Sequence, residues 1–498
     1  MPSLVPPKAV ALSVSLLMVW IIALQLHREA PFKDLHDALS NIYTVAASSG
    51  SVSSSIDPSS PSSSSQAKEQ QHQQGQKPKP QYHAAWDIST FKRKWLSTEL
   101  GGDFDGFRLK QLCVEQVWRD DVVLQMLHSR GGIGNVRGTI LDFLYFSIHA
   151  GVHIVLPGYV KRTDATLDWI DESNGYYPFD NMFDTEWFMR IMNIQCPQMH
   201  IYPTTDDVPN GTVINSEYTM PTARSDKQAR NNDGALMANF KEWLGDQPEY
   251  VAEELNLVNV SAPIWNFDLY PQPRLRTTFG RLLKVSPRIR ELAATAVFNM
   301  RSDLYLGIEP GDQLHRDAYY GVHLRTEVDA ENSGWLRAYG GFDVQTDLHI
   351  EMCKSLGLEV MYVASGNQED VDRFAEKAYK NDGIAVVSKK DLLSEPQQRE
   401  ALENLTWDQQ GALDWEILSR SSFFNGPMMS SFSWNIALRR YFYTDDGDRL
   451  RRENPYAIQE DEAQVTYDDG LSRLIFRTPP ERLLDFSLEM MAPGGMFP

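Results

Sequence analysis

The regular alternation of short apolar runs with helical patterns between residues 318 and 442 constrains the fold of this chain most strongly. The apolar runs have the length of buried strands, and the segments between them have helical periodicity. Strands that alternate with helices form a parallel sheet covered by helices. We therefore expect a doubly wound α/β domain, with strands at 318–325, 358–365, 383–389 and 422–424 and helices at 343–356, 368–380, 408–421 and 432–442.

A second block of the same kind comes earlier in the sequence. The stretch "GGIGNVRG" (131–138) opens a helical pattern that Gly151 ends, and the apolar run 152–157 is typical of a buried strand. Residues 160–270 are rich in Pro, Asn and Asp, which predicts loops and short helices over a cleft. Two such blocks predict an α/β protein with two Rossmann-like doubly wound domains that face a cleft.

The first 85 residues predict a membrane anchor and a disordered stem. Residues 9–26 carry no charge and have the length of a short membrane-spanning helix. A cleaved signal peptide is the alternative, but no clear small-x-small cleavage site follows the apolar run. Residues 27–85 are rich in Ser, Gln and Pro and bury too little apolar surface to fold. This layout is typical of a single-pass type II protein of the Golgi or ER membrane, with its body in the lumen.

Net charge excludes one class of partner. The protein has 67 acidic and 47 basic residues, a formal net charge of −20. Such a protein repels polyanions, so nucleic acid is not an expected partner. An anionic ligand would need a local basic pocket.

Sequons and cysteines bear on the compartment. Glycosylation sequons at Asn210, Asn259 and Asn404 agree with a luminal body. The three cysteines allow at most one disulfide bond, and a pairing of Cys113 with Cys196 stays open. Cys353 lies in a helical pattern and is expected to be a buried thiol.

The glycine loop is the first candidate ligand site. Gly131, Gly132 and Gly134 let the backbone approach a ligand closely, and Asn135 is suited to cap the following helix. Arg137 is then expected in the first helical turn, where a cation opposes the helix dipole and needs a carboxylate or a bound anion. The alternative is an ordinary glycine turn with a surface arginine.

The stretch "YYGVHLRTEVDA" (319–330) is the second candidate. A strand covered on both faces should be apolar on both, but His323 and Arg325 interrupt the pattern at its carboxyl end, where ligands of such sheets bind. Arginine suits phosphate through its planar fork of donors. Asp329 and Glu327 could hold Arg325 or touch the ligand. The alternative is a buried salt bridge, which is costly unless it is well arranged.

The third candidate is "NGPMMSSFSW" (425–434). Ser430 and Ser431 precede a helix, and free amides at a helix start bind phosphate. Phe432 can stack on a base or a sugar face. The alternative is an ordinary serine cap. Ser365 follows another predicted strand and marks a further candidate ligand edge.

Taken together and in this order, the loops resemble those of the GDP-fucose O-fucosyltransferase superfamily. "GGIGNVRG" resembles its first motif, "HLRTEVD" its His-x-Arg-x-x-x-Asp motif, and residues 413–440 its third region. The resemblance covers residues 125–160 and 315–442 and implies a GT-B fold. It implies inverting, metal-independent transfer from a nucleotide sugar, usually GDP-fucose, to a protein or glycan hydroxyl, with no further cofactor.

The resemblance also implies roles for single residues. Asn135 and Arg325 would be catalytic, with Asn135 near the reacting sugar and Arg325 at the departing diphosphate. The donor-binding set would be Gly132, Gly134, Asn135, Arg137, His323, Arg325, Asp329, Ser365, Ser430, Ser431 and Phe432. The glycine loop holds no acid, so the general base stays unassigned among Glu327, Asp164 and Asp168. The acids at 103–105 and 445–448 are interpreted as solvated rather than as metal ligands.

The predicted organisation follows from these expectations. It comprises a cytoplasmic tail (1–8), a membrane anchor (9–26), a stem (27–85), an N-terminal Rossmann-like domain with acceptor-side loops (86–310), a donor-binding Rossmann-like domain (311–445), and an extension that packs back on the body (446–498). Two alternatives keep the fold: another deoxysugar donor such as a rhamnose nucleotide, or an inactive, membrane-anchored glycan-binding or scaffold protein.

Overall fold

The structure of the protein is a computed structural model. It describes residues 86–126, 129–162, 175–209, 211–220, 233–262, 267, 272–332, 334–444, 458–460, 464–477 and 495–498. The predicted anchor and stem, Asp164, Asp168, Asn210 and the acids at 445–448 lie outside these ranges. Within them, no helix combines the length and the apolar character that crossing a membrane requires.

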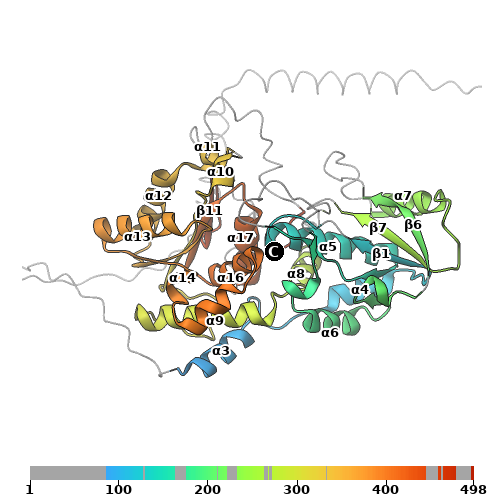
Figure 1. Cartoon of the computed structure of the whole chain (residues 1–498), viewed down its shortest axis with the longest axis horizontal. Helices are drawn as coiled ribbons and strands as arrows, with labels where there is room; N and C mark the ends of the chain where they lie inside the picture. Colours follow the sequence, from blue (N-terminus) through green and yellow to red (C-terminus); the bar gives the residue numbers. More distant parts are fainter. Residues whose placement is uncertain are drawn as a thin grey trace, which may run out of the picture. The chain divides into compact units, whose positions relative to one another are not determined.

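The first sheet has five parallel strands in the order β5-β2-β1-β7-β6. The strands are β1 (Val122–Met126), β2 (His153–Val155), β5 (Ile201–Tyr202), β6 (Thr212–Thr219) and β7 (Asn256–Ser261). The predicted helix after the glycine loop is α5 (Ile133–Ala150), which connects β1 to β2. The other helices in this part are α4 (Phe107–Glu115), α6 (Thr185–Gln195), α7 (Asp233–Gly245) and α8 (Pro273–Gly280) (Figure 1).

The prediction of loops and short helices over residues 160–270 was wrong for much of this region. It contains the sheet strands β5, β6 and β7 as well as the helices α6 and α7. Only alternate residues of β7 are fully buried, and Asn259 and Ser261 occupy half-buried positions. β6 is an edge strand with mostly exposed side chains. Neither strand therefore shows the continuous apolar run by which a buried strand is recognised.

The second sheet has seven strands in the order β10-β9-β8-β11-β14-β13-β12. The strands β8 (Tyr320–His323), β9 (Val360–Ala364), β10 (Ala385–Val387), β11 (Phe423–Pro427) and β14 (Ser472–Arg477) are parallel. The strands β13 (Gln464–Asp468) and β12 (Ile458–Glu460) are antiparallel at one edge. Residues 446–498, predicted as an extension, thus contribute three strands to this sheet.

The four helices predicted for this half lie where periodicity placed them. They are α12 (Phe342–Ser355), α13 (Gln368–Asp382), α16 (Trp407–Leu418) and α17 (Ser431–Tyr443). The remaining helices are α3 (Ile88–Ser97), α9 (Pro287–Asp303), α10 (Val328–Asn332), α11 (Trp335–Tyr339), α14 (Lys389–Leu392) and α15 (Pro396–Glu403), and β3 (Tyr159–Val160) pairs with β4 (Tyr176–Tyr177). The prediction of an α/β fold with two parallel sheets is confirmed.

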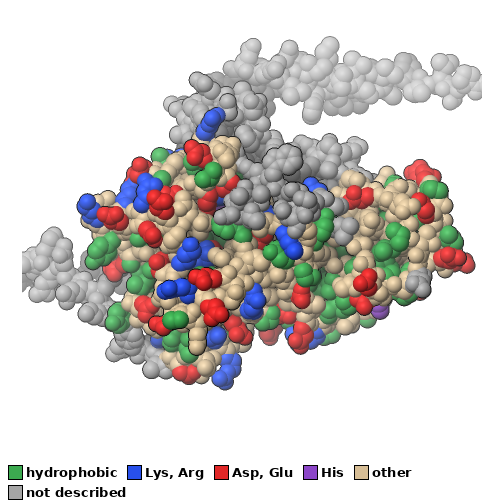
Figure 2. Space-filling model, in the orientation of Figure 1, with side chains coloured by type: hydrophobic (Ala, Val, Ile, Leu, Met, Phe, Trp, Pro, Cys, Tyr) green, Lys and Arg blue, Asp and Glu red, His purple; other side chains and the backbone are tan. Residues whose placement is uncertain are grey.

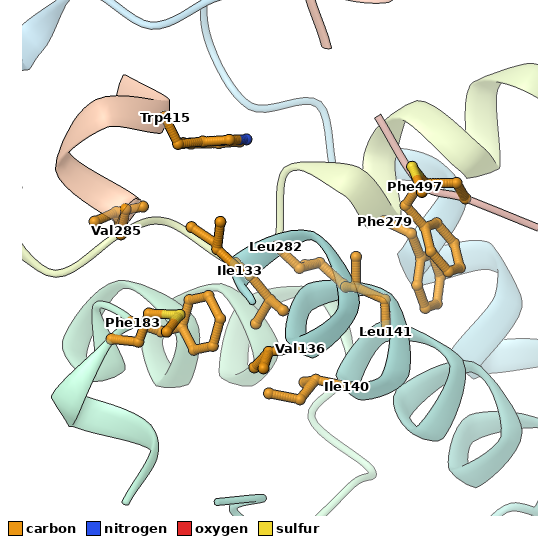
Figure 3. Close-up of a cluster of buried hydrophobic side chains, with 14 of the residues drawn as sticks. Ile133, Val136, Ile140, Leu141, Phe183, Phe279, Leu282, Val285, Trp415 and Phe497 are labelled. Atoms are coloured by element: carbon orange, nitrogen blue, oxygen red, sulfur yellow. The ribbon is translucent and has the colours of Figure 1, made fainter. Parts of the chain in front are cut away.

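Apolar side chains of both halves meet around α5. Figure 3 shows Ile133, Val136 and Leu141 of this helix in one cluster with Trp415 of α16. Phe279 of α8 stacks on Phe497 with ring centroids 5.9 Å apart. The C-terminal residues lie between α17 and α5 (Figure 1). A continuous hydrophobic core therefore runs from the helices of the first sheet to those of the second.

The cysteine pairing that the sequence left open is decided by the structure. Cys113 of α4 forms a disulfide bond with Cys196 at the end of α6, with 5.5 Å between the Cα atoms. Cys353 is a buried free thiol on α12, as predicted. Of the sequons within the described residues, Asn404 is exposed at the end of α15, whereas Asn259 is half-buried on β7.

A buried ionic cluster joins helices far apart in the sequence. Glu99, just after α3, accepts hydrogen bonds from Lys284 and from Arg290 of α9, both at 2.9 Å. Arg290 also lies 3.7 Å from Glu416 of α16. Burial alone would raise the pKa of Glu99, but the charges of Arg290 and Lys284 outweigh it and lower this pKa to about 2. Ionised Glu99 therefore stabilises the fold.

We expect Glu99→Gln to lower the free energy of unfolding by about 2–3 kcal/mol at pH 7. Because the folded pKa lies below the ordinary value of 4.5, this contribution is present above pH 4.5 and is lost as the pH falls toward 2. Urea unfolding of both proteins between pH 7 and pH 3 measures it. The control is Glu291→Gln, since Glu291 is half-exposed and weakly paired with Lys92. A difference independent of pH would contradict the assignment.

Candidate active site

A pocket of about 720 Å³ lies where loops of both sheets meet. One wall comes from the glycine loop that follows β1 and from Arg162 after β3. The other wall comes from residues at the carboxyl ends of β8, β9, β10 and β11. A parallel sheet presents its ligand site at this edge, and the volume suits a ligand of nucleotide-sugar size.

Nine of the predicted site residues line this single pocket. They are Gly132, Asn135, His323, Arg325, Glu327, Ser365, Ser430, Ser431 and Phe432. Three other predicted site residues do not line the pocket. Gly134 lies against Ser431 and Asp329 accepts from Arg325, both of which are lining residues, and Arg137 donates to Asn435 behind the pocket. The three sequence loops therefore converge in space, although about 300 residues separate the first loop from the last.

The glycine loop shapes one wall. Gly131 has a φ of +96°, a left-handed conformation that favours glycine. Helix α5 begins at Ile133 with Gly132 as its N-cap, so the prediction that Asn135 caps the helix was wrong. Asn135 lies inside the first turn, and its buried Oδ1 has no hydrogen-bond partner among the residues that the structure describes. Asn135 also lines the pocket, so its side chain lies beside a ligand bound there.

Arg137 does not line the pocket, and its role in donor binding stays a prediction. It is fully buried and donates to Asn435 Oδ1 at 2.8 Å, to the backbone oxygen of Pro498 at 3.0 Å and to the carbonyl of Gly280. The reason is geometric: two helical positions separate Arg137 from Asn135, a rotation of about 200° about the helix axis. Arg137 thus faces α8 and α17.

Arg325 is held in place from several sides. Its Nη1 donates to Glu327 Oε2 at 2.7 Å and to Asp329 Oδ1 at 3.0 Å, and its Nη2 donates to Asp329 Oδ2. The guanidinium lies 5.0 Å from the ring centroid of Trp335. Gln345 fixes the Arg325 backbone, accepting from its N–H at 2.9 Å and donating to its carbonyl at 2.8 Å. Such packing leaves Arg325 little rotational freedom.

The turn after β8 brings Glu327 and Asp329 within hydrogen-bonding distance of Arg325. β8 ends at His323, and Asp329 belongs to the short helix α10. Arg325 and Asp329 therefore do not lie on the face of one strand. The backbone turns back after the strand, and Asp329 meets Arg325 four residues away. Asp329 therefore positions the arginine.

Glu327 is occupied by three donors. Its Oε2 accepts from Arg325, and its Oε1 accepts from the Gly366 N–H at 2.7 Å and from Ser365 Oγ at 3.2 Å. Burial alone would raise the pKa of Glu327, but the Arg325 charge and the Gly366 N–H outweigh it and lower the pKa. A carboxylate stabilised in this way is a weak base, so the geometry favours the orienting role.

His323 is neutral in this site. Burial and the nearby Arg325 charge lower the pKa of the imidazole to about 3. Its Nδ1 lies 2.9 Å from Ser433 Oγ, and its ring centroid is 4.8 Å from that of Phe432. His323 therefore contributes a polar ring edge rather than a charge.

The structure adds charged residues that sequence reasoning missed. Arg162 donates to Asp408, and Lys389 donates to Asp414 Oδ2 at 2.7 Å. Lys390 is exposed at the rim of the pocket. The lysine pair follows β10 directly, so the strand-end rule that pointed to Arg325 would have found it. Nothing local marks Arg162 or Asp408, because their partners are distant in sequence.

Two helices begin at the pocket, and in the described structure no side chain caps their N-termini. Gly132, the N-cap of α5, has no side chain, and the Ser430 hydroxyl makes no capping hydrogen bond to α17 in the described structure. By contrast, Asn367 caps α13 and Thr406 caps α16. The amides and dipoles of α5 and α17 can therefore attract an anion in the pocket.

Comparison with known protein families gives a match over part of the chain. Residues 124–340 match the model of the family described as GDP-fucose protein O-fucosyltransferase. The matched segment is a little under half of the chain, and the predicted resemblance to this family is confirmed. The match marks the protein as a glycosyltransferase, and the matched segment includes both the glycine loop and the His-x-Arg-x-x-x-Asp motif.

Solved structures match this protein at low identity. POFUT1 in complex with GDP-fucose is 16% identical, with a TM-score of 0.39, over 64% of this protein and 94% of that one. POFUT1 in complex with GDP is 14% identical, with a TM-score of 0.38, over 65% and 96%. A mutant of Arabidopsis thaliana FUT1 in complex with GDP is 11% identical, with a TM-score of 0.34, over 71% and 76%. No curated protein sequence matches this one.

We expect Gly134→Ala to destabilise the protein by about 1–3 kcal/mol. A Cβ at Gly134 would lie 2.6 Å from the backbone carbonyl carbon and oxygen of Ser431, and neither backbone segment can rotate away. Gly245→Ala is the control, because no atom lies within 4 Å of a Cβ there. Thermal unfolding of both variants, with and without GDP, measures the effect. Equal melting temperatures would show that α5 and α17 are not in close contact.

Proposed function

We propose that this enzyme transfers fucose from GDP-fucose to a hydroxyl group of a protein or glycan, with inversion at the sugar carbon and without a metal ion. The observation that carries the proposal is the convergence of Arg325 and the uncapped starts of α5 and α17 on one pocket. The match of residues 124–340 to the O-fucosyltransferase family model makes a GDP-sugar the first donor to consider.

The pocket offers hydrogen-bond donors to a diphosphate group rather than an excess of positive charge. Of its lining residues, Arg162, Arg325, Lys389 and Lys390 are cationic, and Glu327, Glu403, Asp408 and Asp414 are acidic. Three of the cations are already paired with carboxylates. The amides at the two helix starts therefore supply much of the attraction for the phosphates, and Ser430 and Ser431 add hydroxyl groups.

Arg325 supplies the electrostatic part of catalysis. When the bond between sugar and phosphate breaks, negative charge accumulates on the departing diphosphate. A guanidinium already held by Glu327 and Asp329 stabilises this charge without having to reorganise. Asn135, across the pocket, has an Oδ1 without a hydrogen-bond partner in the described part of the chain, and this oxygen can orient the reacting sugar.

Aromatic side chains provide faces for the nucleoside. Phe432 and Trp407 both line the pocket, and Phe432 is only partly buried. The Trp407 ring packs directly against Gly366, where any larger residue would collide with it. A planar base can stack on such surfaces.

We propose a Golgi or ER membrane location with the catalytic body in the lumen, anchored by residues 9–26. The disulfide bond between Cys113 and Cys196 supports an oxidising compartment. Exposed Asn404 is suited to carry a glycan. Microscopy of the tagged full-length protein, with glycosidase treatment to detect a glycan, tests this location.

A panel of nucleotides and nucleotide sugars tests the donor assignment. The full-length protein is heated with GDP, UDP, ADP, GDP-fucose, GDP-mannose and UDP-rhamnose. We expect GDP and GDP-fucose to raise the melting temperature selectively, because ligand that binds only the folded state stabilises it. Release of GDP from GDP-fucose would then show turnover. A shift with UDP-rhamnose alone would replace the donor, and selective GDP binding without any turnover would favour a catalytically inactive protein.

Arg325→Ala is expected to lower GDP release from GDP-fucose by about 10²–10³-fold. The variant should fold, because Gln345 holds the local backbone and not the guanidinium. The control is Arg373→Ala on α13, since Arg373 is half-exposed and pairs with Asp370 outside the pocket. Turnover that is equal in the two variants would remove Arg325 from the catalytic role.

A further inference from the structure

The carboxylates of the pocket differ in how fully they are bonded. Glu327 accepts from three donors. Asp414 accepts from Tyr362 at 2.7 Å and from Lys389 at 2.7 Å, one on each oxygen. Glu403 is exposed at the pocket rim. Within the described ranges, Asp408 accepts hydrogen bonds through Oδ1 alone, so it differs from the other buried acids.

Asp408 is a nearly fully buried carboxylate with one free oxygen. The residue is 3% exposed, and Arg162 donates to Oδ1 through Nε at 3.0 Å and through Nη2. Its Oδ2 is buried and has no hydrogen-bond partner among the described residues. Leaving a buried charged acceptor unbonded costs free energy. A ligand that donates a proton or a hydrogen bond would offset this cost.

The free oxygen is held rigidly. Asp408 lies in the first turn of α16, where Thr406 and Gln409 form a capping box. Gln409 bonds the backbone of Asn181 and accepts from Arg288 at 3.1 Å. The start of α16 is therefore fixed against segments of the first half of the protein, and Asp408 has little freedom to move toward another partner.

Asp408 is also close to the glycine loop. Arg162, its partner, packs on Gly132 so closely that its Nη2 would be 3.2 Å from a Cβ at that position. Gly132 begins the helix that carries Asn135, whose own Oδ1 is buried without a partner in the described residues. The same part of the pocket thus holds two unsatisfied acceptors, and the proposed function brings the reacting sugar to Asn135.

We propose that Asp408 is the general base of the transfer reaction, with Arg162 as its positioning residue. The acceptor hydroxyl forms a bond to the anomeric carbon of fucose as the bond from that carbon to the phosphate oxygen breaks. GDP leaves with the electron pair, and the hydroxyl proton passes to Asp408 Oδ2. The inference rests on the proposed function and assigns the base that the glycine loop lacks.

Chemistry and burial both suit this role. Burial raises the pKa of Asp408 although Arg162 opposes the rise, so the carboxylate is a stronger base than a solvated aspartate. Glu327 has the opposite shift. The alternative role for Asp408 is purely structural, as an ion pair between the two halves of the protein, and an experiment must separate the two.

Hydrolysis of GDP-fucose by the full-length protein distinguishes the general-base role of Asp408 from a structural role. This assay needs no known acceptor, because water takes the place of the acceptor hydroxyl. We expect Asp408→Asn to bind GDP within about threefold of wild type and to lose at least about 100-fold in GDP release. Azide needs no deprotonation, so it should restore GDP release in this variant by at least about tenfold and yield fucosyl azide. Asp408→Ser, which leaves more room for azide, should behave in the same way.

Asp414→Asn is the matched control, because it alters a buried carboxylate of the same pocket that already has two donors. Azide should not restore any turnover that this variant loses. Turnover of Asp408→Asn within fivefold of wild type, or a loss with normal GDP affinity that azide does not relieve in either Asp408 variant, would overturn the assignment. Wild-type protein that neither binds nor hydrolyses GDP-fucose would overturn the donor proposal and this inference with it.

Discussion

The close contact between the starts of α5 and α17 is the constraint on which the rest of the site depends. Gly134 has no side chain, so the α5 backbone can approach the backbone of Ser431. Behind this contact, Asn435 of α17 accepts from Arg137 and from Trp415, which ties α5, α16 and α17 together in a buried network. The glycine loop leads into α5, and the loop with Ser430 leads into α17. The contact between these helices therefore brings both loops to one pocket.

Charge in this pocket is balanced rather than concentrated. The protein is acidic overall, and Figure 2 shows acidic and basic side chains intermingled over the visible face. Within the pocket, carboxylates pair with Arg162, Arg325 and Lys389. Such pairing keeps the cations oriented before a ligand binds, and amides at the helix starts add attraction that costs no buried charge. An acidic protein can thus bind an anionic donor locally.

Sequence reasoning succeeded where a residue's role depends on its near neighbours. The helices and strands of 318–442 follow from periodicity, and the strand-end rule located His323 and Arg325 at the ligand edge. Sequence reasoning failed where a strand is only partly buried or where the predicted start of a helix was wrong. β7 was missed because its half-buried face carries polar residues. Arg137 was assigned to the pocket because the helix was expected to begin three residues later than it does.

The sequence by itself determined the α/β class, four strands and four helices between residues 318 and 442, and three loops that line one pocket, because short-range patterns encode each of these features. Only the tertiary structure decided which loops meet, that Glu327 is saturated, that Cys113 pairs with Cys196, and that Asp408 keeps a free oxygen. These outcomes depend on contacts between residues tens to hundreds of positions apart. Packing selects such contacts through shape and the need to satisfy buried polar groups, and no local pattern records that selection.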